Sequence, residues 1–388
     1  MYLNMKQKIA ITFPHLHHFG GGEIFCEYVT NYLSSYYDID LYYYNVGKIN
    51  SKLKISKKVN LIPVNSSFFF FNFLCSKFIA IAQLFLIIFF LKEKIKYKFI
   101  FSAAGEFVSA RYKVIQYIHH PFYSLNPLHF FSIGVKMFEV HKLFLRFLLS
   151  FIVRVYFILN NEYFRRNITL VNSLWTKIRY KNIYNHNKVY LVYPTFKIPG
   201  LYLENFDKFE KRKNNFVLLG RVSADKNTFK AINFFIKFKK NNSNLNIGVL
   251  HVIGPNNNSL IKKINYYKIY YKNFIKFHNY LSLKQRNKIL KKSKYGLNFS
   301  HDEHFGRAIL EMTKFRLIVF AENSGGCREI LLNSFQKYKS LDDLIIKLIK
   351  VMQSKIIRKK IFNLVFKNLN KEFTDLNFKN ELKKYLVY

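Results

Sequence analysis

The chain has 388 residues, and its 63 lysine and arginine residues against 22 aspartate and glutamate residues give a formal net charge of +41. Half of the residues are hydrophobic, which supports a sizeable core and excludes a largely disordered chain. The length suits two domains of roughly 150–200 residues each. So strong a positive charge favours polyanionic partners, namely nucleic acid, anionic lipid headgroups or phosphorylated substrates.

Three cysteines occur without a C-x-x-C pair, so the sequence indicates neither a disulfide framework nor a cysteine zinc site, and a reducing compartment fits. The first eight residues carry too short an apolar run for a secretory signal.

The amino-terminal segment predicts the start of a doubly wound α/β domain. Its predicted elements are a buried strand at 8–13, a glycine-rich loop at Gly20, Gly21 and Gly22, a helix at 24–33 and a strand at 38–44. The glycines would let the backbone approach a bound phosphate or sugar, with a plain flexible turn as the alternative. The G-x-G-x-x-G fingerprint of dinucleotide sites is absent, although Asp38 or Asp40 could mimic its acidic residue.

The most hydrophobic stretch of the chain is 68–91. As one helix it would be roughly 36 Å long, enough to span a bilayer. Three interpretations stay open: a buried core helix, a helix in the membrane interface and a true span. The segment 143–159 interleaves arginines with large apolar residues, which predicts an interfacial amphipathic helix or, equally, a core helix.

Further strands are predicted at 99–102, 114–118, 168–171 and 189–194. His119 follows the second of these directly, at the carboxyl end of a parallel strand, where such sheets bind ligands. A surface or core histidine is the alternative. A charged segment with a Pro-Gly pair, residues 197–215, predicts an interdomain linker.

A second domain is predicted from the strand at 216–219 onward, with another strand at 250–254. Arg221 and Lys226 lie five residues apart on the loop after the first strand, and such a pair can hold a diphosphate from two sides. In so basic a chain, one basic pair would also be unremarkable.

The stretch 294–330 predicts a strand at 295–300, a polar loop, a helix at 307–314 and a strand at 317–320. Glu303 and Glu311 are eight residues apart, roughly 12 Å along a helix axis, which suits a ligand with hydroxyls at both ends and a diphosphate between them. Two solvated carboxylates are the alternative. The helix start near Gly306 offers unpaired N–H groups for phosphates. The adjacent residues 301–304 splay apart, so no metal site is predicted.

Three motifs of the predicted second domain resemble the donor site of family 4 retaining glycosyltransferases. They are the E-x7-E pattern Glu303-His-Phe-Gly…Glu311, the segment Asn323-Ser-Gly-Gly…Glu329, and Gly220-Arg221…Lys226, which matches G-R-x(4)-K. Two amino-terminal segments, Tyr117-Ile-His-His-Pro and Asn172-Ser-Leu-Trp-Thr, are similar to dolichol-linked oligosaccharide α-1,2-mannosyltransferases within that family. The chain differs from the eukaryotic relatives in lacking a clear amino-terminal membrane anchor.

This resemblance implies a GT-B fold, with two doubly wound Rossmann-like domains facing a cleft. The expected divisions are an acceptor-side domain at 1–196, the linker at 197–215, a nucleotide-sugar-binding domain at 216–360 and a carboxy-terminal helix crossing back at 361–388. The implied reaction is retaining hexosyl transfer, without a cofactor or metal, with mannose from GDP-mannose favoured as the donor.

The same resemblance implies the roles of single residues. Glu303 and His119 would act on the donor sugar as catalytic groups. Donor binding would involve a larger set: Gly20, Gly21, Gly22, Arg221, Lys226, Phe305, Gly306 and Glu311. Of these, Arg221 and Lys226 would neutralise the leaving diphosphate, and Glu311 would hold the ribose hydroxyls.

A lipid-linked oligosaccharide or a cell-surface glycan is the expected acceptor, and the expected location is cytoplasmic, peripheral at the cytoplasmic face of an anionic membrane. Two alternatives remain. A nucleic-acid-binding protein would account for the charge, although no known module is present and no nucleic-acid partner is expected. The other is a non-catalytic membrane-surface protein with a vestigial transferase fold.

Overall fold

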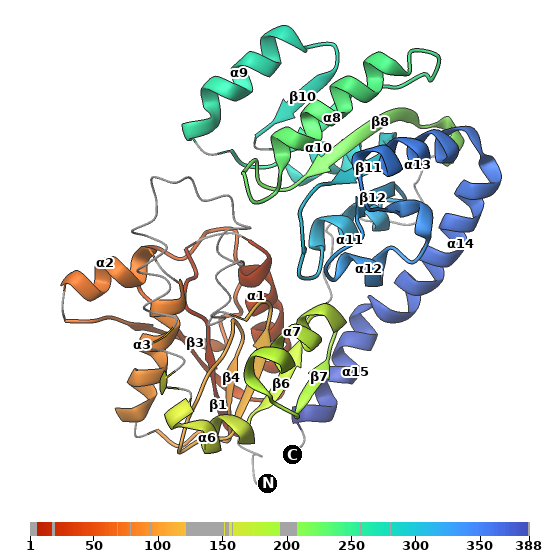
Figure 1. The fold of residues 1–388 in the computed structure, drawn as a ribbon. Coiled ribbons are helices and arrows are strands. Elements are labelled where there is room, and N and C mark those ends of the chain that lie inside the picture. Colours follow the sequence, from red (N-terminus) through yellow and green to blue (C-terminus); the bar gives the residue numbers. More distant parts are fainter. Residues whose placement is uncertain are drawn as a thin grey trace. The chain divides into compact units, whose positions relative to one another are not determined.

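The computed structural model describes residues 6–17, 20–67, 69–77, 79–92, 95–121, 151, 155–156, 158–194, 208–256, 258–279 and 281–386. They form two compact units, each with its own sheet (Figure 1). The first unit contains the described residues up to 194 together with those from Lys379 onward, and the second contains residues 208–378. Most of the predicted helix at 143–159 and residues 197–207 of the predicted linker lie outside the described residues.

The first unit is built on a sheet of seven parallel strands in the order β3-β2-β1-β4-β5-β6-β7. The strands are β1 (Lys8–Thr12), β2 (Asp38–Tyr44), β3 (Val59–Val64), β4 (Ile100–Ser102), β5 (Val114–Ile118), β6 (Ile168–Val171) and β7 (Val189–Leu191). The chain runs outward from β1 to β3 and then returns to the other side of β1 with β4. The carboxyl ends of β1 and β4 are therefore the switch point, where sheets of this kind bind ligands.

The central strands of this sheet are apolar because helices cover both faces. Ile9 and Ile11 of β1 and Ile115 and Ile118 of β5 have no exposed surface. The covering helices of the first unit are α1 (Gly21–Leu33), α2 (Phe69–Lys77), α3 (Ile79–Lys92), α6 (Asn161–Arg166) and α7 (Leu174–Tyr184).

The hydrophobic stretch 68–91 forms the two helices α2 and α3 rather than one. Leu86, Ile87 and Phe90 of α3 are buried in the core of the first unit, which favours the core-helix interpretation for α3. Phe73 of α2 and Ile88 of α3 are about half exposed, at 51% and 43%. In the part of the chain that the structure describes, no helix combines the length and the apolar character needed to cross a membrane.

Asp40 cannot mimic the acidic residue of a dinucleotide site, because it is buried inside the sheet of the first unit. Its carboxylate accepts a hydrogen bond from the Tyr97 hydroxyl at 2.6 Å and pairs with the Lys8 ammonium at 2.9 Å. Burial and the bond to Asp40 raise the pKa of Tyr97 well above its usual range, so the phenol stays a donor. The aspartate therefore serves the packing of β1 and β2.

The second unit is built on six parallel strands in the order β10-β9-β8-β11-β12-β13. The strands are β8 (Lys213–Leu219), β9 (Leu250–Ile253), β10 (Ile275–His278), β11 (Ser293–Asn298), β12 (Ile318–Glu322) and β13 (Lys337–Tyr338). Here the order reverses between β8 and β11, so the switch point lies at the carboxyl ends of these two strands. Both sheets are parallel and covered by helices, which confirms the predicted fold class of two doubly wound domains.

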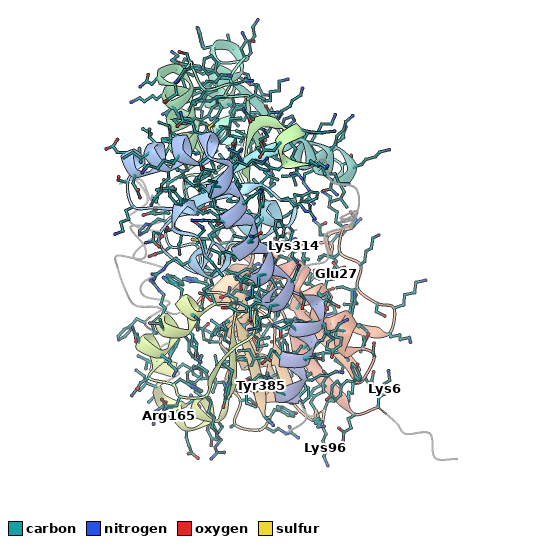
Figure 2. All side chains as sticks on the ribbon, turned by 90° about the vertical axis from the view of Figure 1, so that its right-hand side faces the viewer. Lys6, Glu27, Lys96, Arg165, Lys314 and Tyr385 are labelled. Atoms are coloured by element: carbon teal, nitrogen blue, oxygen red, sulfur yellow. The ribbon has the colours of Figure 1, made fainter. Side chains whose placement is uncertain are left out.

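Helices on both faces complete the second unit, and the last helix returns to the first. The helices are α8 (Thr228–Asn241), α9 (Ile261–Tyr270), α10 (Leu283–Lys292), α11 (Arg307–Lys314), α12 (Cys327–Ile330), α13 (Leu341–Gln353), α14 (Lys355–Glu372) and α15 (Asp375–Leu386). Tyr385, near the end of α15, is labelled in Figure 2. Its ring lies against that of Tyr190 of β7, with ring centroids 4.7 Å apart. The Tyr37 hydroxyl also donates to the carbonyl of Leu386 at 3.4 Å.

Candidate functional site

A hollow lies at the carboxyl ends of β8 and β11, the switch point of the second sheet. It is a shallow hollow of about 260 Å³, a volume that includes open solvent, and the predicted residues Arg221 and Lys226 lie in its wall. Its other polar lining comes from Gly220 and Thr228 beside β8 and from Asn298 and Ser300 at the end of β11. The position is the one where parallel sheets bind ligands, and its lining offers two cations together with hydroxyl and amide groups.

The loop between β8 and α8 is held against the end of β11. Asn227, just before α8, has a left-handed backbone with φ of 49°, and its side-chain amide donates to the carbonyl of Phe299 at 3.0 Å. Asparagine tolerates this conformation better than most residues. The bond joins the loop that carries Arg221 and Lys226 to the loop that carries Glu303.

Lys226 and Glu303 form an ion pair across these two loops, with 2.7 Å between Nζ and Oε2. The two side chains are 32% and 18% exposed. Burial raises the pKa of Glu303, but the Lys226 ammonium, together with His304 and Ser300, outweighs burial, so the pKa lies below its usual value. The structure thus brings together a predicted phosphate-binding cation and a predicted sugar-binding carboxylate.

Arg221 is the freer of the two predicted cations. Its side chain is 68% exposed, and it lies 3.4 Å from Asp225 on the same loop. An exposed ion pair at this distance contributes little energy and is readily exchanged for another anion.

The loop carrying Glu303 is supported from behind by residues 324–326. The Gly326 N–H donates to the carbonyl of Glu303 at 2.7 Å, and the Ser324 hydroxyl accepts from the Asp302 N–H at 3.0 Å. Gly325 has φ of +66°, and a Cβ there would lie 2.3 Å from the Glu303 carbonyl oxygen. Only glycine fits so close to that backbone. The Ser-Gly-Gly segment therefore positions Glu303.

Helix α11 begins at Arg307, directly after Gly306, whose φ is +95°. Glu303 therefore precedes the helix, and the estimate of 12 Å along a helix axis is wrong for this pair. Glu311 lies within the helix, and its carboxylate is 2.8 Å from the Arg286 guanidinium of α10. Phe305 is 5% exposed and packs near Phe373, so any donor contact from it would be through its backbone.

A second hollow of about 340 Å³ adjoins the first, since Val252 lines both. His278 and Asn256 are among its polar residues, and the Asn256 Oδ1 has no hydrogen-bond partner among the described residues. The Asn215 amide donates to His251 Nε2 at 3.1 Å, so His251 Nδ1–H donates to His278 Nε2 at 3.0 Å. His278 is thereby left with a proton on Nδ1.

The predicted residues of the first unit form a separate group. Helix α1 begins at Gly21, earlier than predicted, so Gly21 and Gly22 belong to its first turn and Gly20 precedes it. One turn further on, Phe25 contacts the ring of His119 edge-on, with centroids 4.8 Å apart. The glycines and His119 thus lie close to one another, beyond the carboxyl ends of β1 and β5.

His119 has a neutral ring in a defined orientation. Its Nε2–H donates to the Ala103 carbonyl at 3.2 Å, and burial lowers its pKa to about 4. The remaining ring nitrogen, Nδ1, is then an acceptor. The Asn172 amide donates to the His119 carbonyl at 3.0 Å, and the Thr176 hydroxyl holds Asn172 at 2.7 Å. The two amino-terminal segments that resemble mannosyltransferases therefore meet here.

Three site residues were not anticipated. Arg286 lies in the basic helix α10 and belongs to no motif, and the same holds for His278, the last residue of β10, and for Asn256, which follows β9. His301, considered for a metal, pairs with Glu322 at 2.9 Å. Among the described residues, no group of three or more metal-binding side chains occurs.

Residues 203–362 match the family model of glycosyl transferases group 1. The chain is also 25% identical, over 225 residues, to a GDP-Man:Man(3)GlcNAc(2)-PP-Dol alpha-1,2-mannosyltransferase of Eremothecium gossypii. That alignment covers 56% of this chain and 38% of the relative, so the chain spans well under half the length of the curated protein it matches.

Among solved structures, HepE of Anabaena, in complex with UDP and glucose, is 13% identical, with a TM-score of 0.67 over 98% of this chain and 99% of that one. A glycosyltransferase of Rickettsia africae is 16% identical, with a TM-score of 0.65 over 98% of both chains. At these identities the likeness shows the fold. The described units therefore have the GT-B fold, and residues 203–362 are similar to glycosyl transferases group 1.

Proposed function

We propose that this protein is a retaining glycosyltransferase that moves a hexose from a nucleotide-sugar onto a glycan acceptor without a metal ion. The proposal favours mannose from GDP-mannose. Its support is the resemblance of the Tyr117–Pro121 and Asn172–Thr176 segments to mannosyltransferases, together with the name of the Eremothecium relative.

The observation that carries the proposal is the group of charges in the hollow between β8 and β11. Arg221 and Lys226 line it, and Lys226 pairs with Glu303 at 2.7 Å. In the proposed reaction, the two cations stabilise the negative charge that develops on the leaving diphosphate, the part a divalent ion takes in other transferases. Since phosphate is a stronger partner for Lys226, donor binding frees the Glu303 carboxylate.

The nucleoside of the donor would occupy the adjoining hollow and the start of α11. Glu311, held by Arg286, would accept hydrogen bonds from the ribose hydroxyls. His278, with a proton on Nδ1, and Asn256, with an unpartnered carbonyl oxygen, offer one donor and one acceptor to the edge of a base.

The transferred sugar would meet two groups in this proposal. The freed Glu303 carboxylate would accept from a sugar hydroxyl. His119, neutral at physiological pH, would accept from another through Nδ1 or steady the developing positive charge. Its carbonyl already accepts from Asn172, so the ring is the more available group. No residue is proposed as a covalent nucleophile.

The proposed acceptor is a lipid-linked oligosaccharide or a cell-surface glycan, and the proposed location is the cytoplasmic face of an anionic membrane. The support is the excess of positive charge, since a field of this sign attracts both anionic headgroups and diphosphate-linked acceptors.

The test is calorimetric binding of GDP-mannose, UDP-glucose and UDP-N-acetylglucosamine, with and without EDTA, to the native chain and to Lys226→Ala and Glu311→Ala. Selective binding of one donor that survives EDTA and is lost in both variants is the expected result. Lys230→Ala is the matched control, because Lys230 is an exposed lysine one turn along α8 and outside the hollow. Binding of no donor by the native chain, or equal losses in the control, would refute the proposal.

A further inference from the structure

Helices α8 and α9 lie side by side on one face of the second sheet. They connect β8 to β9 and β9 to β10, two neighbouring steps in the same direction, and right-handed crossovers place both helices on the same face. Contacts agree with this, because the Tyr267 hydroxyl of α9 donates to the Asn233 side chain of α8 at 2.7 Å. Phe229 also stacks on Tyr267, with centroids 5.7 Å apart.

This half of the second unit contains no carboxylate. Residues 226–301 include sixteen lysines and arginines and neither aspartate nor glutamate, so all 22 acidic residues of the chain lie elsewhere. A high genomic frequency of lysine codons adds cations but does not remove carboxylates from one stretch of 76 residues. The absence of acidic residues therefore marks this half as uniformly electropositive.

The outward side of the two helices combines lysines with large apolar groups. We call it the α8–α9 face, and its residues, all exposed, are Lys230, Lys237, Lys240, Lys262, Lys263, Tyr266, Ile269 and Tyr270. In α9 the spacing of 262, 266, 269 and 270 places these residues on one side of the helix, opposite the buried Ile264. Ile269 and Tyr270 are 67% and 69% exposed. In Figure 2 the nitrogen-tipped side chains at the top of the view, where these helices lie, project outward.

We propose that the α8–α9 face docks on an anionic lipid surface. This docking proposal rests on the proposed membrane location and names the surface that binds the membrane, and it does not depend on which nucleotide-sugar is the donor. Lysine ammonium groups pair with anionic headgroups, and tyrosine and isoleucine suit the interfacial layer between headgroups and acyl chains. The aromatic pair Tyr266 and Tyr270, with centroids 4.9 Å apart, would enter that layer together with Ile269.

Lipid fits this face better than nucleic acid does. The cations of the face are all lysines, whereas arginine, which stacks on bases and grips phosphate with two bonds, is absent from it. The only arginine of residues 226–301, Arg286, is engaged with Glu311. Burial of the apolar Ile269 side chain in lipid would also stabilise binding, whereas contact with a nucleic-acid base would not.

The experiment is flotation of the full chain with vesicles of phosphatidylcholine containing about 30% phosphatidylglycerol, compared with pure phosphatidylcholine. The charge variant Lys230→Gln/Lys237→Gln/Lys262→Gln is expected to bind the anionic vesicles roughly a hundredfold more weakly. The matched control removes the same charge from exposed lysines of α14, as Lys355→Gln/Lys359→Gln/Lys360→Gln, and should keep most of the affinity.

A second variant, Tyr266→Ser/Ile269→Ser/Tyr270→Ser, retains every lysine. The native chain should stay partly bound in about 0.5 M salt, where screening removes most of the electrostatic term, and this variant should be released. Neither variant should change the affinity for a soluble nucleotide-sugar measured without vesicles. A native chain that binds vesicles but no donor would refute the proposed transferase and leave the docking face standing.

Three results would overturn the docking proposal. The first is an equal loss of vesicle binding in the α14 control, which would mean that net charge alone acts. The second is vesicle binding that the Tyr266→Ser/Ile269→Ser/Tyr270→Ser variant leaves unchanged both at low salt and in about 0.5 M salt. The third is a single-stranded RNA oligonucleotide that binds more tightly than the anionic vesicles and depends on the same residues, which would assign the face to nucleic acid.

Discussion

Replacing Lys226 by methionine separates the contribution of its charge from the contribution of its packing. Methionine keeps most of the volume of lysine and removes its charge, so Glu303 loses its partner 2.7 Å away while packing changes little. Removing one member of a fully buried ion pair costs about 3–5 kcal/mol, and exposed pairs contribute about 0.2–1 kcal/mol. Because Lys226 is 32% and Glu303 18% exposed, we expect a loss of about 2 kcal/mol.

The loss should depend on pH, in a direction set by Glu303. In the native chain its pKa lies below the ordinary value of 4.5, so the ion pair stabilises the fold above that pH and loses its effect as the pH falls further. In Lys226→Met the lowering by Lys226 is lost while burial still raises the pKa of Glu303, so this pKa should be higher than in the native chain. The difference in stability should therefore be smallest at the acid end of the range and largest at neutral pH.

Thermal unfolding of both chains between pH 4 and 8 measures this difference. A loss of about 2 kcal/mol corresponds to roughly 4–8 °C for a domain of this size. The control is the double variant Lys226→Met/Glu303→Gln, which leaves no stranded carboxylate and should recover most of the stability. Donor affinity should stay about 10- to 150-fold reduced in both variants, because the charge for the diphosphate is gone. Equal destabilisation of the single and double variants at every pH would refute the reasoning.

Three other predictions follow from the same contacts. Arg286→Ala should raise the KM for the donor at least tenfold with a smaller change in kcat, since Glu311 loses the group that orients it. Arg286→Lys should restore part of the affinity, and steady-state kinetics of both variants measure these changes. Stability should fall as the pH drops from about 6.5 to 4, because His119 stays neutral in the fold, with a pKa of about 4, while the unfolded histidine takes up a proton. His119→Asn should make that slope shallower in pH-dependent thermal unfolding, and His251, whose pKa burial also lowers to about 4, should keep part of it. Gly325→Ala should lower the free energy of unfolding, measured with denaturant, by about 1–3 kcal/mol and should weaken donor binding, because its Cβ would lie 2.3 Å from the Glu303 carbonyl oxygen. Unchanged donor affinity would contradict the supporting role of that glycine.

The sequence predicts the fold well where strands are mostly apolar. The strands at 38–44, 114–118 and 168–171 have the predicted limits, because a strand covered by helices on both faces is rich in apolar residues. Strand β3, at the edge of its sheet, contains a proline, and β10 alternates two apolar residues with Lys276 and His278. Both patterns also occur in loops, and neither strand is predicted.

The residues of the site are predictable from motifs, but their partners are not. Nothing within either motif shows that Lys226 and Glu303, 77 residues apart, pair with each other. Arg286 is one of five cations in α10, and only its ion pair with Glu311 of α11 distinguishes it from the other four. Asp40 fails as a ligand candidate for a similar reason, because the lysine and tyrosine that bury it come from other strands and loops.

The return of α15 to the first unit makes that unit discontinuous along the chain. Its sheet is complete by Leu191, yet Tyr190 and Tyr37 contact residues that follow the whole second unit. During synthesis at about 5–20 residues per second, the first unit would wait on the order of 10–40 s for these contacts. The second unit can therefore reach its final fold before the first unit does, and the first unit is complete only when the last helix packs against it. An isolated amino-terminal fragment should be aggregation-prone unless residues from Lys379 onward are supplied as a peptide.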